Sequence, residues 1–139
     1  MNYKTLQLDF DSEIATITLD RPDKRNAISH ELIEDLIHAL REVNNSPARI
    51  LILTGAGKAF SSGMDLDNLK ALIGRSPEQN LADSRTMVSL FRSLYEFPKP
   101  TIAAVMAASS IKSTMASATE TFSVSKPTMN PAVTYIPAL

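Results

Sequence analysis

Apolar and polar residues alternate over the first twenty positions of the chain, and this pattern predicts two β-strands. Leu6, Leu8 and Phe10 are separated by polar residues, and the segment 14–19 repeats the alternation. The polar residues 11–13 between the two segments predict a turn. The chain is therefore expected to begin with two strands joined by a short connection.

Helical spacing replaces the alternation after Ser29, which is a favourable N-cap residue. The apolar residues that recur every three or four positions are Leu32, Ile33, Leu36, Ile37, Leu40 and Val43. Pro47 and its polar neighbours end this helix, and the uninterrupted apolar run 50–53 is typical of a strand that is buried on both faces. The order strand, helix, strand predicts a parallel crossover.

A second helical region follows a glycine-containing turn. Residues 65–73 predict a short helix, and Ser76-Pro77-Glu78-Gln79 has the pattern of a capping box with proline at the first helical position. The longer helix is expected to end before Pro98 and to turn these residues inward: Leu81, Met87, Leu90, Phe91, Leu94 and Tyr95. Residues 101–105 then predict another buried strand. The fold class is α/β.

The character of the chain changes after Val105. The remaining segment is rich in Ser, Thr, Ala and Met, and it shows no sustained period of either kind. All four glycines lie before it, the last of them at position 74. We therefore divide the chain into a core, residues 1–105, and a divergent, weakly structured tail, residues 106–139.

Composition removes several classes of function. A length of 139 residues suits one domain, and a net charge of -1 gives no excess of cations for nucleic acid. No apolar run is long enough to cross a membrane, so a cytoplasmic protein without membrane or nucleic-acid partners is expected. The chain lacks cysteine, and its two histidines, His30 and His38, are eight residues apart without a third ligand, so no metal site is predicted.

The segment 50–69, ILILTGAGKAFSSGMDLDNL, runs a strand into a glycine turn and then into a helix start, an arrangement that leaves backbone N–H groups free to bind an anion. It does not fit a nucleotide-binding loop, because Ile52 replaces the first glycine and Ala59 replaces the hydroxyl residue that binds magnesium. Nor does Ser61 fit a nucleophile elbow, since Ala59 precedes it where glycine is required.

Three blocks in order, RPDKRNA (21–27), LILTGAGKAFSSGMDL (51–66) and FPKPTIAAV (97–105), resemble the first half of the enoyl-CoA hydratase/isomerase, or crotonase, superfamily. The resemblance implies a crotonase-like ββα spiral core, incomplete at its carboxyl terminus. It also implies an enzyme that acts on acyl-CoA thioesters through an oxyanion hole. Both hydratase and isomerase chemistry stay open, as does the acyl specificity.

The resemblance further implies particular site residues. The backbone N–H of Met64, the residue after Gly63, is expected to be one oxyanion donor. Lys24 and Arg25 are expected near the phosphate or pantetheine part of coenzyme A. The other positions expected to contact the substrate through backbone or pocket-lining atoms are Ala27, Ser61, Ser62, Gly63, Asp65 and Leu66. Coenzyme A is part of the substrate, and no separate cofactor is expected. The resemblance also implies assembly, since relatives of this kind form trimers.

The tail departs from the family pattern. In an ungapped register, Lys112 stands where the family has the glycine of its second oxyanion donor, and Met115 and Ala132 stand where hydratases have a pair of glutamates. The terminal VTYIPAL resembles the family again, so a shifted reading frame or decay of residues 106–130 are both possible origins. The alternative to an enzyme is accordingly an inactive, truncated CoA-binding half-domain, whose exposed sheet edge and apolar helix faces would favour aggregation or assembly with another chain.

Overall fold

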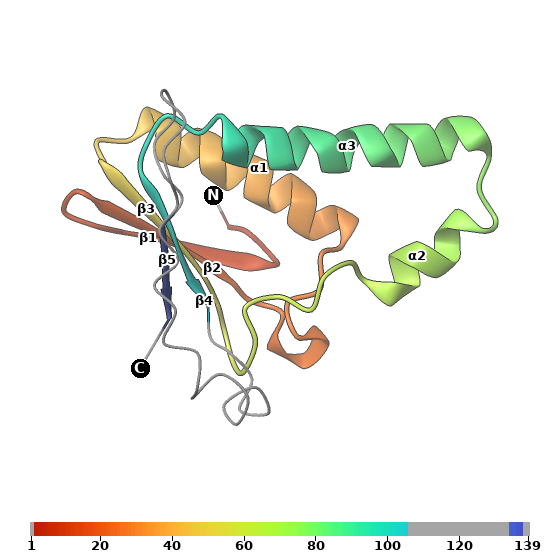
Figure 1. The fold of residues 1–139 in the computed structure, drawn as a ribbon, viewed down its shortest axis with the longest axis horizontal. Helices are drawn as coiled ribbons and strands as arrows, with labels where there is room; N and C mark the ends of the chain where they lie inside the picture. Colours follow the sequence, from red (N-terminus) through yellow and green to blue (C-terminus); the bar gives the residue numbers. More distant parts are fainter. Residues whose placement is uncertain (1, 106–133, 138–139) are drawn as a thin grey trace, which may run out of the picture.

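The computed structural model describes residues 2–105 and 134–137 of the chain, as one sheet with helices on one side of it (Figure 1). Its elements are β1 (Leu6–Asp11), β2 (Ile14–Leu19), the 3₁₀ turn η1 (Pro22–Lys24), α1 (His30–Asn45), β3 (Ile50–Gly55), α2 (Leu66–Leu72), α3 (Pro77–Tyr95), β4 (Thr101–Val105) and β5 (Thr134–Pro137). The five strands lie in the order β1-β2-β3-β4-β5. The predicted α/β class is confirmed.

The first two strands form the predicted hairpin. β1 and β2 are antiparallel, with Leu6 opposite Leu19 and Asp11 opposite Ile14. Ser12 completes the tight connection with a φ of 53°. β2 and β3 are parallel, so the predicted crossover through α1 is also confirmed.

Helix α1 begins where the sequence predicts. The Ser29 hydroxyl oxygen accepts a hydrogen bond from the Leu32 N–H at 3.2 Å, which satisfies one of the free donors of the first turn. Five of the six apolar positions predicted for this helix are buried, namely Leu32, Ile33, Leu36, Leu40 and Val43, whereas Ile37 is partly buried. The stripe packs on the sheet and supplies much of the core.

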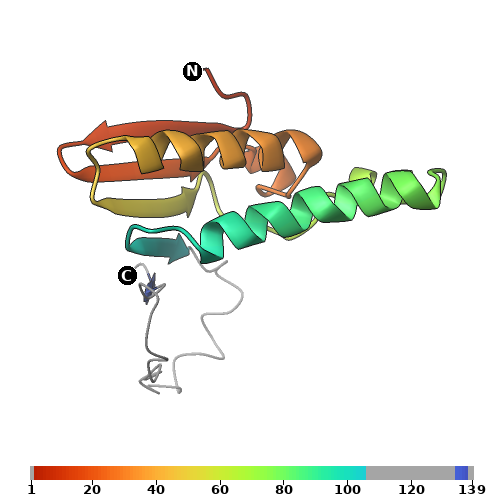
Figure 2. The same cartoon turned by 90° about the horizontal axis from the view of Figure 1, so that it is seen from above.

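The strands are less completely buried than predicted. In β3, Leu51 and Leu53 are buried, whereas Ile50 and Ile52 between them are only half-buried, and every residue of β4 is half-buried. The reason is that α1 and α3 lie on the same side of the sheet (Figures 1 and 2). Successive side chains of a strand point to opposite faces, so one set lies under the helices and the other does not. The expectation of strands buried on both faces is therefore wrong for the described part of the chain.

Helix α3 has the predicted capping box. The Ser76 hydroxyl oxygen accepts from the Gln79 N–H, and the Gln79 side chain accepts from the Ser76 N–H. Its packing differs from the prediction, however, because Leu81, Phe91 and Tyr95 are exposed by 52%, 54% and 75%.

Only a narrow stripe of α3 packs on the core: Leu90 is buried, and Met87 and Leu94 lie partly buried beside it. The first half of the helix extends past the edge of the sheet (Figure 2), and Leu81, which lies in that half, is 52% exposed. Phe91 and Tyr95 are rotated to the flank of this stripe. One flank of α3 is thus apolar and accessible.

One strand lies within the segment that was expected to be weakly structured. β5 is parallel to β4, with Ile102 opposite Thr134 and Val105 opposite Pro137. Local pattern did not reveal it because an edge strand of four residues is defined by its hydrogen bonds to a neighbour that is distant in sequence. This strand coincides with the segment VTYIPAL in which the family resemblance returns.

Candidate active site

The candidate site lies where β2 and β3 end. Parallel strands bring their carboxyl ends to one edge of a sheet, and here that edge joins the loop 20–29 to the loop 56–65. The loops begin to pair at once, since the Ala56 N–H donates to the Leu19 carbonyl at 2.8 Å. Further along, the Ser62 N–H donates to the Arg25 carbonyl at 2.9 Å. The two family-like segments 21–27 and 51–66 therefore form one structural unit.

Asn26 holds this unit from within. Its side chain is completely buried, and its amide nitrogen donates to the carbonyls of Ala56 and Ala59 at 2.9 and 2.7 Å. Its side-chain oxygen accepts from the Arg21 N–H at 2.8 Å. With a φ of 53°, Asn26 also adopts the left-handed conformation that Asn tolerates better than most residues. One side chain thus fixes both loops, and Gly55 lies so close to it that a Cβ there would be 2.7 Å from the Asn26 amide nitrogen.

A second polar connection joins Arg21 to Asp65. The guanidinium donates to the Asp65 carboxylate at 3.0 Å and to the Ala27 carbonyl at 2.6 Å. Asp65 also caps α2 by accepting from the Asp67 N–H at 3.0 Å. That N–H, followed by the Arg21 guanidinium, lowers the pKa of the Asp65 carboxyl below its usual value. A buried, ionised Asp65 therefore ties the end of the glycine turn to the loop after β2.

The backbone at Met64 is set by a single parallel bridge to Ile28. The Ile28 N–H donates to the Gly63 carbonyl at 2.8 Å, and the Asp65 N–H donates to the Ile28 carbonyl at 3.0 Å. In such a bridge the flanking residues make both bonds, so the Met64 N–H points away from Ile28. It has no hydrogen-bond partner among the residues that the structure describes. Gly63 reaches this geometry with a φ of 91°, which disfavours any residue with a Cβ, although the space around it is open.

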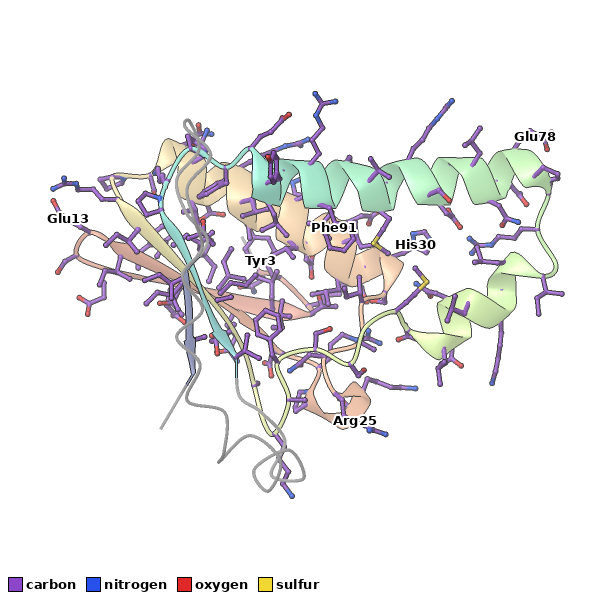
Figure 3. The ribbon with its side chains drawn as sticks, in the orientation of Figure 1. Tyr3, Glu13, Arg25, His30, Glu78 and Phe91 are labelled. Atoms are coloured by element: carbon purple, nitrogen blue, oxygen red, sulfur yellow. The ribbon has the colours of Figure 1, made fainter. Side chains whose placement is uncertain are left out.

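A pocket of about 250 Å³ lies beside Met64, between the start of α1, helix α2 and helix α3. Its apolar lining residues are Ile33, Met64, Leu72, Met87 and Val88, and its polar lining residues are His30, Asn68, Asp83 and Ser84. The polar side carries charge: the Asp83 carboxylate contacts both the His30 imidazole, at 3.2 Å, and the Arg75 guanidinium. Figure 3 shows His30 at the start of α1 on the side that faces α3.

The predicted site residues lie in two groups. Gly63, Met64 and Asp65 are held together by the Ile28 bridge, and Ala27 is buried beside them. Lys24 and Arg25, by contrast, are exposed on the turn that contains η1, where Arg25 points away from the helices (Figure 3).

The other predicted positions lie on the accessible side of the glycine turn. The Lys24 ammonium pairs with the Asp67 carboxylate at 3.5 Å, and Leu66 is 70% exposed. Ser61 accepts from the Gly63 N–H at 3.2 Å and so shapes the turn, while Ser62 is exposed. Of all the predicted residues, only Met64 lines the pocket.

Two residues that organise the site were missed at the sequence level. Arg21 and Asn26 were seen only as letters of the RPDKRNA block, although their side chains make most of the connections described above. The available signal was two polar residues capable of several hydrogen bonds, Arg21 and Asn26, in the loop just after a predicted strand. Lys112, Met115 and Ala132, the tail positions that depart from the family pattern, lie outside the described residues.

Metal-binding and membrane-spanning features are the remaining classes to consider. Within residues 2–105 and 134–137, the side chains form no group of three or more His, Cys, Asp or Glu suited to a metal ion. None of the helices described there is both long and apolar enough to cross a membrane.

Comparison with known proteins identifies the family of the chain. The family model for enoyl-CoA hydratase/isomerase matches residues 9–110, and the chain belongs to that family. A crystal structure of an enoyl-CoA hydratase from Shewanella pealeana superposes with a TM-score of 0.73 at 35% identity, over 76% of this chain and 40% of that one. The expected crotonase-type fold is therefore confirmed for the amino-terminal part of the chain.

Curated relatives include both hydratases and isomerases. A hydroxycinnamoyl-CoA hydratase-lyase of Pseudomonas fluorescens is 37% identical over 106 residues, which are 74% of this chain and 38% of that protein. The human enoyl-CoA delta isomerase 2 is 32% identical over 104 residues, 74% of this chain and 26% of that protein. The chain thus spans well under half the length of the relatives it matches.

Proposed function

We propose that this chain binds an acyl-CoA thioester and contributes one half of an oxyanion hole to an enoyl-CoA hydratase- or isomerase-type reaction. The observation that carries the proposal is the Met64 N–H, which has no hydrogen-bond partner among the described residues and which belongs to a residue lining the pocket. A thioester carbonyl gains negative charge as the adjacent carbons react. A fixed N–H donor stabilises that charge without having to reorient.

In this proposal the substrate lies across Met64. The thioester oxygen accepts from the Met64 N–H, and the acyl group extends into the pocket between α1 and α3. The coenzyme A portion extends from the pocket across the exposed glycine turn. There the exposed Ser62 and the open space around Gly63 allow the coenzyme A chain to approach the backbone closely. Lys24 and Arg25 lie on the same exposed edge and supply positive charge for its phosphates. No cofactor other than the coenzyme A of the substrate is needed for this chemistry.

Arg21 and Asn26 act as positioning residues in this scheme. They do not reach the pocket, but they fix the loop whose Ile28 orients Met64. Their rigidity matters because an oxyanion donor contributes only when it is already aimed at the developing charge.

A second candidate is an acyl-CoA-binding half-domain without catalysis. It is favoured by Lys112, Met115 and Ala132, which occupy the positions where the resemblance calls for a glycine donor and two glutamates. Loss of a general acid or base typically lowers the rate about a hundred- to ten-thousandfold. The two candidates share the binding step and differ only in turnover.

The test combines calorimetric titration with crotonyl-CoA and an assay of crotonyl-CoA hydration and double-bond shift on the same sample. Met64→Pro removes the N–H, and Met64→Ala is the matched control because it retains the N–H and changes only the side chain. If the chain is an enzyme, Met64→Pro lowers turnover about a hundred- to a thousandfold while Met64→Ala stays active. Saturable binding without turnover selects the half-domain, and a folded chain that binds no acyl-CoA refutes both candidates.

A further inference from the structure

The pocket beside Met64 has an unusual feature for an acyl site, because one of its sides carries an imidazole held by a carboxylate. His30 is the first residue of α1, and Asp83 lies across the pocket on α3. Their contact, His30 Nε2 to Asp83 Oδ2, measures 3.2 Å. It engages only one nitrogen of the ring, and the His30 side chain remains 38% exposed. The Nδ1 atom is therefore left for another partner.

The polar side of the pocket carries balanced charges. Asp83 Oδ2 contacts the Arg75 guanidinium as well as the His30 imidazole, so a ligand meets one carboxylate that is paired with one permanent cation. A charged acyl substituent would gain little here and would lose its hydration. A neutral hydroxyl suits the site better, because it can donate to or accept from the Nδ1 atom, which the contact with Asp83 does not engage.

The size of the pocket limits the acyl group. An apolar cavity of about 150 Å³ holds benzene, so the present volume of about 250 Å³ accommodates an aromatic ring with a short connection. The chain connection also limits the distance between the two residues. Ile28 is bridged to Met64 and His30 follows two residues later, so the Cα atoms of His30 and Met64 are at most about 12 Å apart. This upper limit is comparable with the length of a ring-sized acyl group, so one ligand can contact both residues.

We propose that His30, oriented by Asp83, makes the pocket selective for ring-sized acyl groups that carry a terminal hydroxyl. His30 is then a specificity-determining residue that touches the substrate far from the reacting carbons, and Asp83 positions it. The inference rests on the proposed acyl-CoA function, because it assumes that the acyl group occupies this pocket.

The test compares two ligands that differ by one hydroxyl, 4-hydroxycinnamoyl-CoA and cinnamoyl-CoA, by calorimetric titration of the whole chain. The unaltered chain is expected to bind the hydroxylated ligand up to about tenfold more tightly, since one additional hydrogen bond contributes about that factor. His30→Phe keeps the ring shape, and it should bring the ratio of the two affinities close to one. His38→Phe, an exposed histidine on the same helix, is the matched control and should keep the preference.

Equal affinity for the two ligands in the unaltered chain overturns the inference, and so does a preference that survives in His30→Phe. The first of these comparisons needs no variant, so it stands even if His30→Phe fails to fold. His30→Gln retains a hydrogen-bond acceptor and should recover part of the preference. A folded chain that binds neither ligand refutes the proposed acyl-CoA function itself, whereas equal binding of both refutes only the role of His30.

Discussion

Replacing Asn26 is the most informative perturbation of the site, because this one side chain connects both loops. Asn26→Ala deletes three hydrogen bonds, two donated to the carbonyls of Ala56 and Ala59 and one accepted from the Arg21 N–H. At about 1 kcal/mol each, these bonds contribute about 3 kcal/mol to the free energy of unfolding. The left-handed backbone, with a φ of 53°, adds about 1 kcal/mol against alanine. The expected loss is about 4 kcal/mol.

Urea unfolding followed by far-ultraviolet circular dichroism measures this loss. With an m-value of about 2 kcal/mol/M, the midpoint for Asn26→Ala should fall by about 2 M. Asn26→Gly deletes the same bonds but relieves the backbone penalty, so it should lose about 1 kcal/mol less than Asn26→Ala. Asn44→Ala is the control, since Asn44 is exposed on α1, and it should stay within about 0.5 kcal/mol of the unaltered chain. A shift below about 0.5 M for Asn26→Ala would refute the role assigned to this side chain.

Three further predictions concern close packing and two titrating groups. Gly55→Ala should lower the free energy of unfolding by about 1–3 kcal/mol, because a Cβ there would lie 2.5 and 2.7 Å from backbone carbonyl oxygens. In Gly74→Ala the new Cβ meets nothing within 4 Å, so this control variant should be neutral or slightly stabilising. Equal effects of the two variants in urea unfolding would contradict this prediction. The hydrogen bond from the Asp67 N–H is the main cause that lowers the pKa of the Asp65 carboxyl, so Asp65 stabilises the fold fully above its unfolded pKa of 3.8 and loses that contribution as the pH falls towards the folded pKa. The difference in free energy of unfolding between the unaltered chain and Asp65→Asn should therefore shrink in acid. A difference independent of pH would disprove the assignment. Burial raises the pKa of the Tyr3 phenol from 10.0 to about 12, so the contribution of Tyr3 to the free energy of unfolding is complete below pH 10 and is lost as the pH rises to about 12. Melting curves should show the unaltered chain losing more stability than Tyr3→Phe over that interval. Parallel losses in the two proteins would count against this role of Tyr3.

The exposed side of α3 affects how these measurements are made. Leu81, Val88 and Phe91 lie on one side of the helix and are 52%, 63% and 54% exposed. Apolar residues gathered in this way favour association at the concentrations that calorimetry requires. The titrations are therefore best accompanied by sedimentation measurements on the same samples.

The sequence by itself determined the local elements and their order. The hairpin, the α1 stripe and the Ser76 capping box all depend on residues close in the chain, and each lies where its pattern predicts. The crossover pairs strands that are further apart, but its direction follows from the order strand, helix, strand. The family blocks likewise marked the loops that form the site, because the turn at Gly63 requires a local backbone conformation that only certain residues adopt.

Only the tertiary structure decided which faces are buried and which side chains meet. The half-buried alternate residues of β3 follow from both long helices lying on one side of the sheet, and the pairing of β5 with β4 joins segments about thirty residues apart. The connections made by Asn26, the bridge between Ile28 and Met64, and the contact of His30 with Asp83 each link residues distant in sequence. A periodic pattern reports the environment of a residue along its own element. It carries no information about the partner that folding brings from elsewhere in the chain.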